Sequence, residues 1–287
     1  MNILLNAATK AQLDLAIANP SHALLVVGPD GVGKGTIAKY LSAEILALAE
    51  EKLSQYPYIR TIAPDDKGTI SIDAIRDVQK FLQLKTIGKR PIRRIIIIEH
   101  ADSLTREAQN AFLKLLEEPP SDTIMMLTAA NVRALLPTML SRLQTLTVRP
   151  PEETALREWF VGQDPTSIAQ AYFLSGGLPG LMHALLQDDE KHPLLASVSV
   201  AKGLLQMSLF ERLVAIDPLS KQRINARYVI DALLRITQVS LAQATTKQDA
   251  QRIAQWHRIR KTALAAREEL EHNASTKLIL SNLVLHI

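Results

Sequence analysis

The chain has 287 residues, 47% of them hydrophobic, which is enough for two or three domains that each bury a core. Its apolar runs fall short of the roughly 20 residues of a membrane helix, and its first residues lack the basic start and apolar core of a secretory signal, so we expect a globular cytoplasmic protein. The lack of cysteine excludes disulfides and thiolate zinc sites, the seven scattered histidines predict no structural metal, and the net charge of +4 permits contact with nucleic acid without requiring it.

The first half of the chain alternates short β-rich apolar runs with helical patterns, which predicts a parallel sheet with helices on its faces. The expected strands are His22–Val27, Tyr58–Ala63, Arg94–Glu99, Thr123–Thr128 and Gln144–Val148. The expected helices between them are Gly33–Glu51, Ile72–Leu84, Thr105–Glu117 and a short one near Pro137–Arg142. Thr105 is expected to cap its helix, because a threonine side chain accepts a hydrogen bond from the first helical turn.

A glycine-rich loop follows the first expected strand and opens the first expected helix. Its backbone N–H groups would point at phosphates, and Lys34 would neutralise the outer phosphates. The loop therefore predicts a site for ATP or ADP. The residues expected to hold the nucleotide are Gly28, Gly31, Gly33, Lys34, Gly35 and Thr36, with Glu99 from the third strand.

The loop departs from the usual phosphate-binding pattern directly after its lysine. Gly35 replaces the serine or threonine whose hydroxyl holds magnesium, and Thr36 lies one helical position further on. The loop therefore lacks the hydroxyl that usually holds magnesium at this position. Phosphate binding survives this change elsewhere, since enzymes that phosphorylate nucleoside monophosphates also carry Gly-Lys-Gly-Thr.

The strand that should carry the hydrolytic carboxylates ends in Glu99 and His100 instead of an acidic pair. The apolar run before them predicts a buried central strand that brings both side chains to the edge of the sheet beside the loop. Glu99 could still hold magnesium, whereas His100 has a different reach and protonation from a carboxylate that orients water. A buried strand that simply ends in a polar pair explains His100 equally well.

Glu117 and Glu118 end the next expected helix, where negative charge opposes the helix dipole. We therefore expect them to have partners, either across an interface or, as we favour, within the fold. Further along the chain, Ser141 and Arg142 lie at the end of the short expected helix, just before the last expected strand, and this pair alone indicates nothing.

The chain beyond Pro150 lacks strand patterns and is predicted to be all-helical. Ile230, Leu233, Leu234 and Leu241 fall on one helical face. Turn-rich segments interrupt this half at residues 175–180 and 188–193, so a small helical domain is expected to end near residue 190.

Together these features resemble the AAA+ subunits of the bacterial sliding-clamp loader, and most closely the delta-prime subunits of DNA polymerase III. The resemblance covers nearly the whole chain and depends on the order and spacing of several short segments. These are His22–Leu25, Ala63–Asp66, Ile72–Val78, Leu116–Pro120, the pair Ser141 and Arg142, and Gly177–Gly180.

The chain also departs from the motor subunits of that family. The motor subunits carry an acidic pair where this chain has Glu99 and His100, and a polar sensor where it has Ala129 and Ala130. They also carry a sensor arginine near the position of Gly180, which this chain lacks. Loss of these features is typical of delta-prime subunits. Two further departures are a short linker in place of a four-cysteine zinc module and a leucine in place of the cysteine after the Ser-Arg pair. The linker is Lys52–Pro57 and the leucine is Leu143.

The resemblance implies three domains: an α/β P-loop (AAA+) parallel-sheet domain over residues 1–149, a small helical lid over 150–190 and an all-helical oligomerisation collar over 191–287. It implies a stator-like clamp-loader subunit with an impaired ATPase site, in a hetero-oligomeric ring that acts on the sliding clamp and primer-template DNA. In that family the Ser-Arg arginine projects into a neighbour's ATP site, which assigns Arg142, with Ser141, as an arginine finger in trans.

Three alternatives remain. The nearest is a catalytically active AAA+ clamp-loader ATPase, and a small-molecule P-loop kinase is less favoured because no lid with phosphate-binding arginines is evident. A plain nucleic-acid-binding module would use the basic cluster between the second expected helix and third expected strand, for which we favour a solvated loop. That cluster comprises Lys85, Lys89, Arg90, Arg93 and Arg94.

Overall fold

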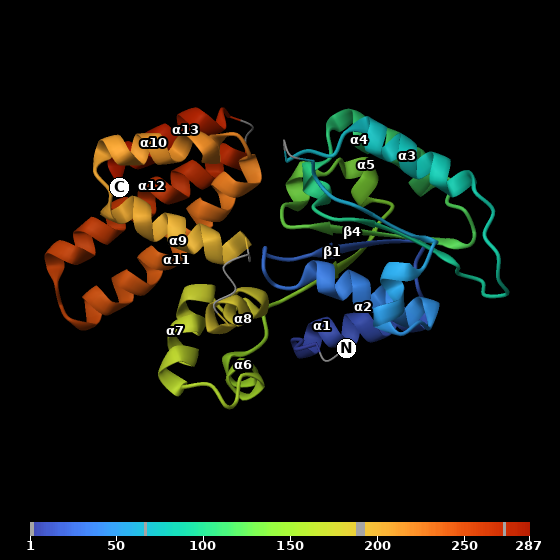
Figure 1. Cartoon of the computed structure of the whole chain (residues 1–287), viewed down its shortest axis with the longest axis horizontal. Coiled ribbons are helices and arrows are strands. Elements are labelled where there is room, and N and C mark those ends of the chain that lie inside the picture. Colours follow the sequence, from blue (N-terminus) through green and yellow to red (C-terminus); the bar gives the residue numbers. More distant parts are fainter. Residues whose placement is uncertain (1–2, 66–67, 188–192, 272–273) are drawn as a thin grey trace. The chain divides into compact units, whose positions relative to one another are not determined.

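A computed structural model describes residues 3–65, 68–187, 193–271 and 274–287, and the chain divides into two units, Met1–Glu152 and Glu153–Ile287. The first unit is an α/β domain and the second is built from helices (Figure 1). The expected boundary between lid and collar, at residues 190 and 191, lies outside the described residues. The three-domain division therefore stays a prediction.

A five-stranded parallel sheet forms the centre of the first unit, with the strand order β2-β3-β4-β1-β5. The strands are β1 Ala23–Val27, β2 Ile59–Ile62, β3 Arg94–Ile98, β4 Thr123–Ala129 and β5 Gln144–Thr147. The helices are α1 Ala7–Ala18, α2 Lys34–Leu46, α3 Ile72–Gln83, α4 Arg106–Glu117 and α5 Pro137–Leu140, with short 3-10 turns η1 Glu50–Gln55, η2 Ala101–Ser103 and η3 Val132–Ala134. Helices α1 and α2 cover one face of the sheet, and α3, α4 and α5 cover the other (Figure 1). The predicted α/β class and all five strands are confirmed.

Burial on both faces explains why β3 and β4 are largely apolar, with uninterrupted apolar runs at residues 95–98 and 124–127. Every residue of these two strands is buried, as expected for strands inside a parallel sheet that helices cover on both sides. The predicted cap of α4 is also confirmed, because the Thr105 hydroxyl accepts a hydrogen bond from the Ala108 N–H at 3.2 Å.

The first predicted helix is shorter than expected. It ends at Leu46 instead of Glu51, because Ala47 adopts a left-handed conformation (φ 46°) and its N–H bonds back to Ala43 and Glu44. The expected linker is largely the 3-10 turn η1. Ala47 lies in a stretch of alanine and leucine, and these residues give no stop signal of the kind that glycine gives.

In its described residues the second unit consists of helices joined by turns and loops, with an isolated bridge between Val161 and Gln163 instead of a strand. Its helices are α6 Glu153–Trp159, α7 Pro165–Ser175, α8 Pro179–Gln187, α9 Pro193–Gln206, α10 Leu209–Ser220, α11 Arg223–Thr246, α12 Ala250–Glu271 and α13 Thr276–His286. Helix α11 is central and packs against α7, α9, α10 and α12. Its buried side chains include Ile230, Leu233 and Leu234, which lie on the predicted apolar face.

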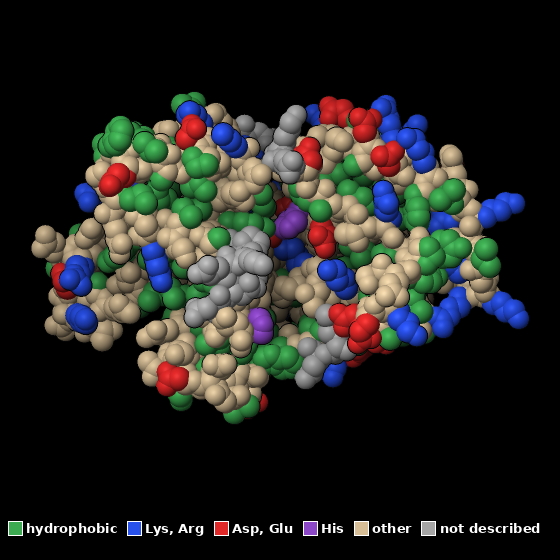
Figure 2. Space-filling view, viewed as in Figure 1, with side chains coloured by type: hydrophobic (Ala, Val, Ile, Leu, Met, Phe, Trp, Pro, Cys, Tyr) green, Lys and Arg blue, Asp and Glu red, His purple; other side chains and the backbone are tan. Residues whose placement is uncertain are grey.

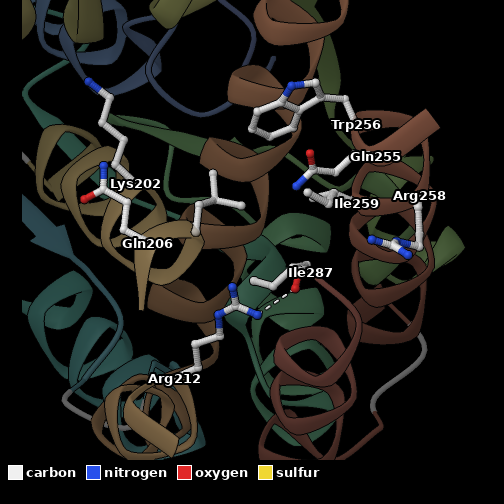
Figure 3. A pocket seen from close by; sticks show the side chains of 9 residues that line it. Lys202, Gln206, Arg212, Gln255, Trp256, Arg258, Ile259 and Ile287 are labelled. Atoms are coloured by element: carbon white, nitrogen blue, oxygen red, sulfur yellow. Dashed lines mark hydrogen bonds between the residues drawn. The ribbon is translucent and has the colours of Figure 1, made fainter. Parts of the chain in front are cut away.

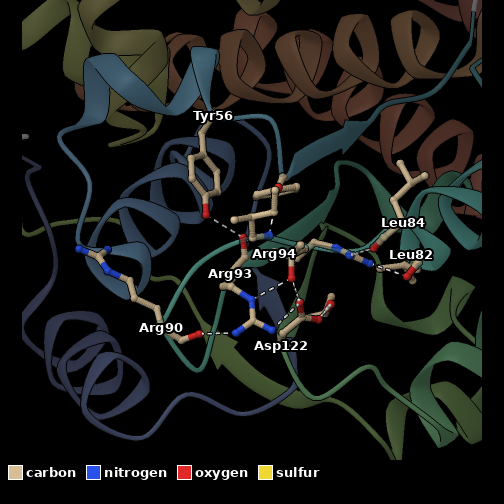
Figure 4. A network of polar contacts seen from close by, with 11 residues as sticks. Tyr56, Leu82, Leu84, Arg90, Arg93, Arg94 and Asp122 are labelled. Atoms are coloured by element: carbon tan, nitrogen blue, oxygen red, sulfur yellow. Dashed lines mark hydrogen bonds and ion pairs between the residues drawn. The ribbon is translucent and has the colours of Figure 1, made fainter.

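A polar network fixes the start of β3 and part of the basic loop before it (Figure 4). The guanidinium of Arg93 contacts the Asp122 carboxylate at 3.3 Å and donates to the Thr86 hydroxyl at 2.8 Å. Arg94 is buried and donates to the Leu82 carbonyl at 2.6 Å. Two of the five basic residues considered above as a nucleic-acid surface are therefore held by the fold itself.

Asp122 makes the stability of this network depend on pH. Burial alone would raise the pKa of Asp122, but hydrogen bonds from Thr86 and Thr123 and the charges of Arg94 and Arg93 lower it below its ordinary value. A lowered pKa in the folded state means that the carboxylate stabilises the fold above the unfolded pKa of about 4 and loses that contribution as the pH falls through the folded pKa.

We therefore expect Asp122→Asn to lower the free energy of unfolding near pH 7 by about 1 to 2 kcal/mol, because the partly buried Arg93 and Thr86 lose a charge-assisted partner. The difference from the unmodified chain should shrink as the pH falls below about 4. Urea unfolding at several pH values measures it. If Asp122→Asn lowered the free energy of unfolding by the same amount at pH 7 and well below pH 4, the role of this carboxylate would be contradicted.

Candidate functional site

The glycine-rich loop joins β1 to α2 at the carboxyl edge of the sheet. Gly33 caps α2 in a left-handed conformation (φ 97°), which a residue with a side chain rarely adopts. Gly28 has a different requirement: a Cβ atom there would lie 2.7 Å from the Val148 carbonyl oxygen, just after β5. The first glycine of the loop is therefore needed for packing, whether or not a phosphate binds.

Lys34 turns back into its own loop. Its ammonium nitrogen donates to the carbonyl oxygens of Gly28 at 2.9 Å and Pro29 at 3.1 Å, and to the Asp30 carboxylate at 3.0 Å. The side chains of Lys34 and Asp30 are only 6% and 4% exposed. The lysine expected to meet phosphates is thus already paired with a buried carboxylate of the loop.

Gly35 and Glu99 lie against each other across the start of α2. A Cβ atom at position 35 would lie 3.3 Å from Oε1 of Glu99, closer than side chains normally approach. A serine or threonine at this position would therefore crowd the Glu99 carboxylate, which would have to shift by a few tenths of an ångström. Thr36 is exposed, so the structure assembles Lys34, Gly35 and Glu99 but leaves the displaced hydroxyl on the helix surface.

His100 follows Glu99 in a left-handed conformation (φ 51°), and its backbone N–H donates to the Thr128 hydroxyl at 3.0 Å. Its ring nitrogen Nδ1 lies 4.0 Å from the Asp30 carboxylate. Nearby, the Asp102 carboxylate accepts from the N–H groups of Ala130 at 3.2 Å and Asn131 at 2.9 Å, which holds the segment after β4. This edge of the sheet therefore carries three acidic residues and one histidine.

Sequence reasoning did not single out Asp30 or Asp102. For Asp30 the signal was its place in the same short loop as Lys34, which brings the two charges within reach of each other once the loop turns back. Asp102 carried no comparable signal, since its partners are backbone N–H groups of residues far away in the sequence.

Arg142 and Ser141 form a second group, around the end of α5. The Arg142 guanidinium pairs with the Glu117 carboxylate at 2.9 Å and donates to the Thr138 carbonyl at 2.9 Å. This pair confirms the partner within the fold that was predicted for Glu117, and it joins two segments on which the family resemblance depends. The Arg142 and Glu117 side chains are 37% and 50% exposed, so both remain open to solvent.

Leu143, which directly follows Arg142, packs into the core of the first unit. The core around it includes Phe112, Met139 and Leu127. Leucine therefore fills this position as an ordinary apolar side chain and leaves the preceding arginine at the surface.

The second unit has a pocket of about 370 Å³ between α9, α10 and α12 (Figure 3). Its wall includes Lys202, Arg212, Trp256 and Arg258, and the Arg212 guanidinium donates to the Ile287 carbonyl at 2.6 Å. None of its lining residues carries a carboxylate, imidazole or hydroxyl side chain. Its chemistry suits contact with an anionic or aromatic group rather than acid-base catalysis.

Across residues 3–65, 68–187, 193–271 and 274–287, no group of three or more histidine or acidic side chains is arranged to hold a metal ion. Within the same ranges, every helix is too short or too polar to cross a membrane.

Comparison with known proteins places these features in context. Residues 6–152 match the protein family described as DNA polymerase III, delta subunit. The chain is 32% identical over 182 residues to DNA polymerase III subunit delta' of Pseudomonas aeruginosa, an alignment that covers 56% of this chain and 55% of that protein. It is 30% identical over 186 residues to DNA polymerase III subunit delta' of Escherichia coli, covering 58% of this chain and 55% of that protein. The chain thus spans about half the length of the relatives that it matches.

Among solved structures, a DNA polymerase III gamma subunit-related protein from Thermotoga maritima has a similar fold. The superposition has a TM-score of 0.52 at 18% sequence identity and covers 97% of both chains. At this identity the similarity concerns the fold alone, and it extends over both units.

Proposed function

Because the chain belongs to the DNA polymerase III delta' subunit family, we propose that it is a clamp-loader subunit that works as a stator. In this proposal it joins motor subunits in a hetero-oligomeric ring and supplies Arg142 to a neighbour's ATP site. It takes part in loading the sliding clamp on primer-template DNA through the complex. The family match over residues 6–152 is the observation that carries this proposal.

The state of the nucleotide loop supports a stator rather than a motor. Magnesium in P-loop enzymes is held by the hydroxyl after the lysine, and that position is Gly35, with Glu99 packed against it. The residue expected to orient the attacking water is His100, whose Nδ1 faces Asp30 at 4.0 Å. Both departures reduce hydrolysis without disturbing the sheet.

The setting of Arg142 supports a role in trans. A guanidinium is always charged, and it can bind phosphate oxygens through two parallel hydrogen bonds. Arg142 is solvent-accessible at the end of α5, and its only charged partner among the described contacts is the half-exposed Glu117. An exposed ion pair contributes about 0 to 1 kcal/mol, so a neighbour's phosphates could replace Glu117 at little cost.

An apolar patch on the second unit supports assembly through the proposed collar. The patch comprises Met207, Leu209, Phe210, Leu213 and Val214, all of them exposed, at the start of α10 (Figure 2). Phe210 alone is 77% exposed. Contiguous exposed apolar side chains mark interaction surfaces, and aromatic residues contribute strongly to binding at such surfaces.

The alternative is a catalytically active AAA+ ATPase, which the retained Lys34 and Glu99 keep open. We expect the isolated chain to hydrolyse ATP negligibly, because Gly35 and His100 stand at the magnesium and water positions. Steady-state turnover of the isolated chain measures this. Turnover of about one per second or faster that disappears in Lys34→Ala would favour the motor.

The complete proposal is tested by co-purification of the chain with the other replication subunits. ATPase assays on the assembled and isolated proteins then separate a stator, a motor and an unrelated enzyme. If the chain is a stator, it joins the complex, and ATP is hydrolysed by the assembled complex through its active subunits but not by the isolated chain.

A further inference from the structure

Three acceptors surround the Lys34 ammonium group, and an ammonium carries three protons. Two acceptors are the carbonyl oxygens of Gly28 and Pro29, and the third is the Asp30 carboxylate at 3.0 Å. The loop itself thus provides an acceptor for each of the three protons of Lys34. In a working phosphate site, that positive charge would be available to a ligand.

Burial makes the Asp30 contact more consequential than a surface ion pair. The two side chains are 6% and 4% exposed, so the charges are largely removed from water. Removing one partner of such a pair leaves an uncompensated buried charge, which is strongly unfavourable. A phosphate could therefore reach Lys34 only by displacing Asp30 and taking its place.

The neighbouring charges increase this cost. Glu99 packs against the start of α2, and an incoming phosphate would lie near two carboxylates of the same sign. The His100 ring faces Asp30, so the carboxylate is flanked by the lysine on one side and by a ring nitrogen on another. Of these two neighbours, Lys34 is the one that donates a hydrogen bond to Asp30, whereas the His100 nitrogen lies 4.0 Å away.

We propose that Asp30 is a built-in anion that occupies Lys34 and lowers the affinity of this loop for nucleotide phosphates. The loop keeps its shape without a nucleotide because the carboxylate does for Lys34 what a phosphate does in an active P-loop protein. This inference rests on the proposed function only in treating the loop as a disabled nucleotide site.

The test compares the full chain with Asp30→Asn and Asp30→Ala. Calorimetric titrations with ATP, ADP and inorganic phosphate, each with and without magnesium, separate nucleotide recognition from phosphate recognition. We expect both variants to bind ATP and ADP at least about tenfold more tightly than the unmodified chain, which corresponds to about 1.4 kcal/mol. Asp73→Asn is the matched control, because it removes the same charge from the exposed first turn of α3.

Lys34→Ala in the Asp30→Ala background should abolish the gain, since the freed lysine is what binds the phosphate. Unchanged affinity in both Asp30 variants would overturn the proposal, as would a gain that also occurs in Asp73→Asn or persists without Lys34.

If the variants are less stable, the rise in melting temperature on adding ATP gives the same answer, because a ligand stabilises the form that binds it. A rise no larger than that of the unmodified chain counts against the proposal. These measurements use the isolated chain, so their failure leaves the assembly and loading tests unaffected.

Discussion

Arg142→Ala is expected to leave the fold and the assembly of the loader intact and to slow ATP hydrolysis in the adjacent active subunit. Arginine fingers in other systems contribute on the order of 10³ to 10⁵ in rate, because the guanidinium stabilises charge that spreads over phosphate oxygens in the transition state. One finger among several in a ring should show a smaller effect in bulk turnover. DNA-stimulated ATP turnover and clamp loading by the reconstituted complex measure it.

Two controls separate this role from a local one. The local role is the contact of Arg142 with the Thr138 carbonyl and Glu117, which would affect only stability, by at most about 1 kcal/mol. Glu117→Gln breaks the ion pair but keeps the arginine, so turnover should survive. Arg133→Ala removes another exposed arginine from the same unit and should have no effect. Unchanged turnover and loading in Arg142→Ala, with equal assembly and melting temperature, would leave the chain a purely architectural subunit.

Loss of the proposed collar is expected to abolish ring formation. A chain that ends near Asp189 lacks α9 to α13 and with them the apolar patch around Phe210. Size-exclusion chromatography and calorimetry measure association with the other subunits, which should fall below detection. If the shortened chain still joined the complex with unchanged affinity, the collar assignment would be wrong.

A single substitution in the full chain makes the same test without removing helices. Phe210→Asp places a charge in the centre of the patch and should weaken association about 30-fold or more, the effect of losing about 2 kcal/mol at an interface hot spot. Phe173→Asp is the matched control, because Phe173 is also an exposed phenylalanine but lies on α7. Equal loss in both variants would point to general destabilisation instead.

The sheet could be predicted closely from the sequence because its signals are local. Every observed strand lies within one residue of its predicted ends, since β3 and β4 contain the apolar runs at residues 95–98 and 124–127 and the others are bounded by polar or turn residues. Helix α1 was not expected. Its buried residues are Thr9, Leu13 and Ala16, so it lacks the stripe of large apolar side chains that identifies a helix.

The residues of the nucleotide loop could be listed from the sequence, but their contacts could not. Whether Lys34 faces a ligand or Asp30 depends on the backbone angles of the glycines and on burial by the surrounding strands. Likewise the sequence predicted a partner for Glu117 without identifying Arg142, because that contact joins the end of α4 to the end of α5. Local sequence patterns predict helices and strands, whereas a contact between the ends of two different helices can be identified only from the folded structure.

The close approach of Gly28 to the Val148 carbonyl has an evolutionary consequence. Any side chain at this position would push the segment after β5 away from the loop, so the packing of the sheet favours glycine at position 28 whether or not the loop binds nucleotide. A glycine signature can therefore persist in descendant genes after the ATP-dependent reaction has gone. Gly28 alone is thus a mark of how the sheet packs and not of an active nucleotide site.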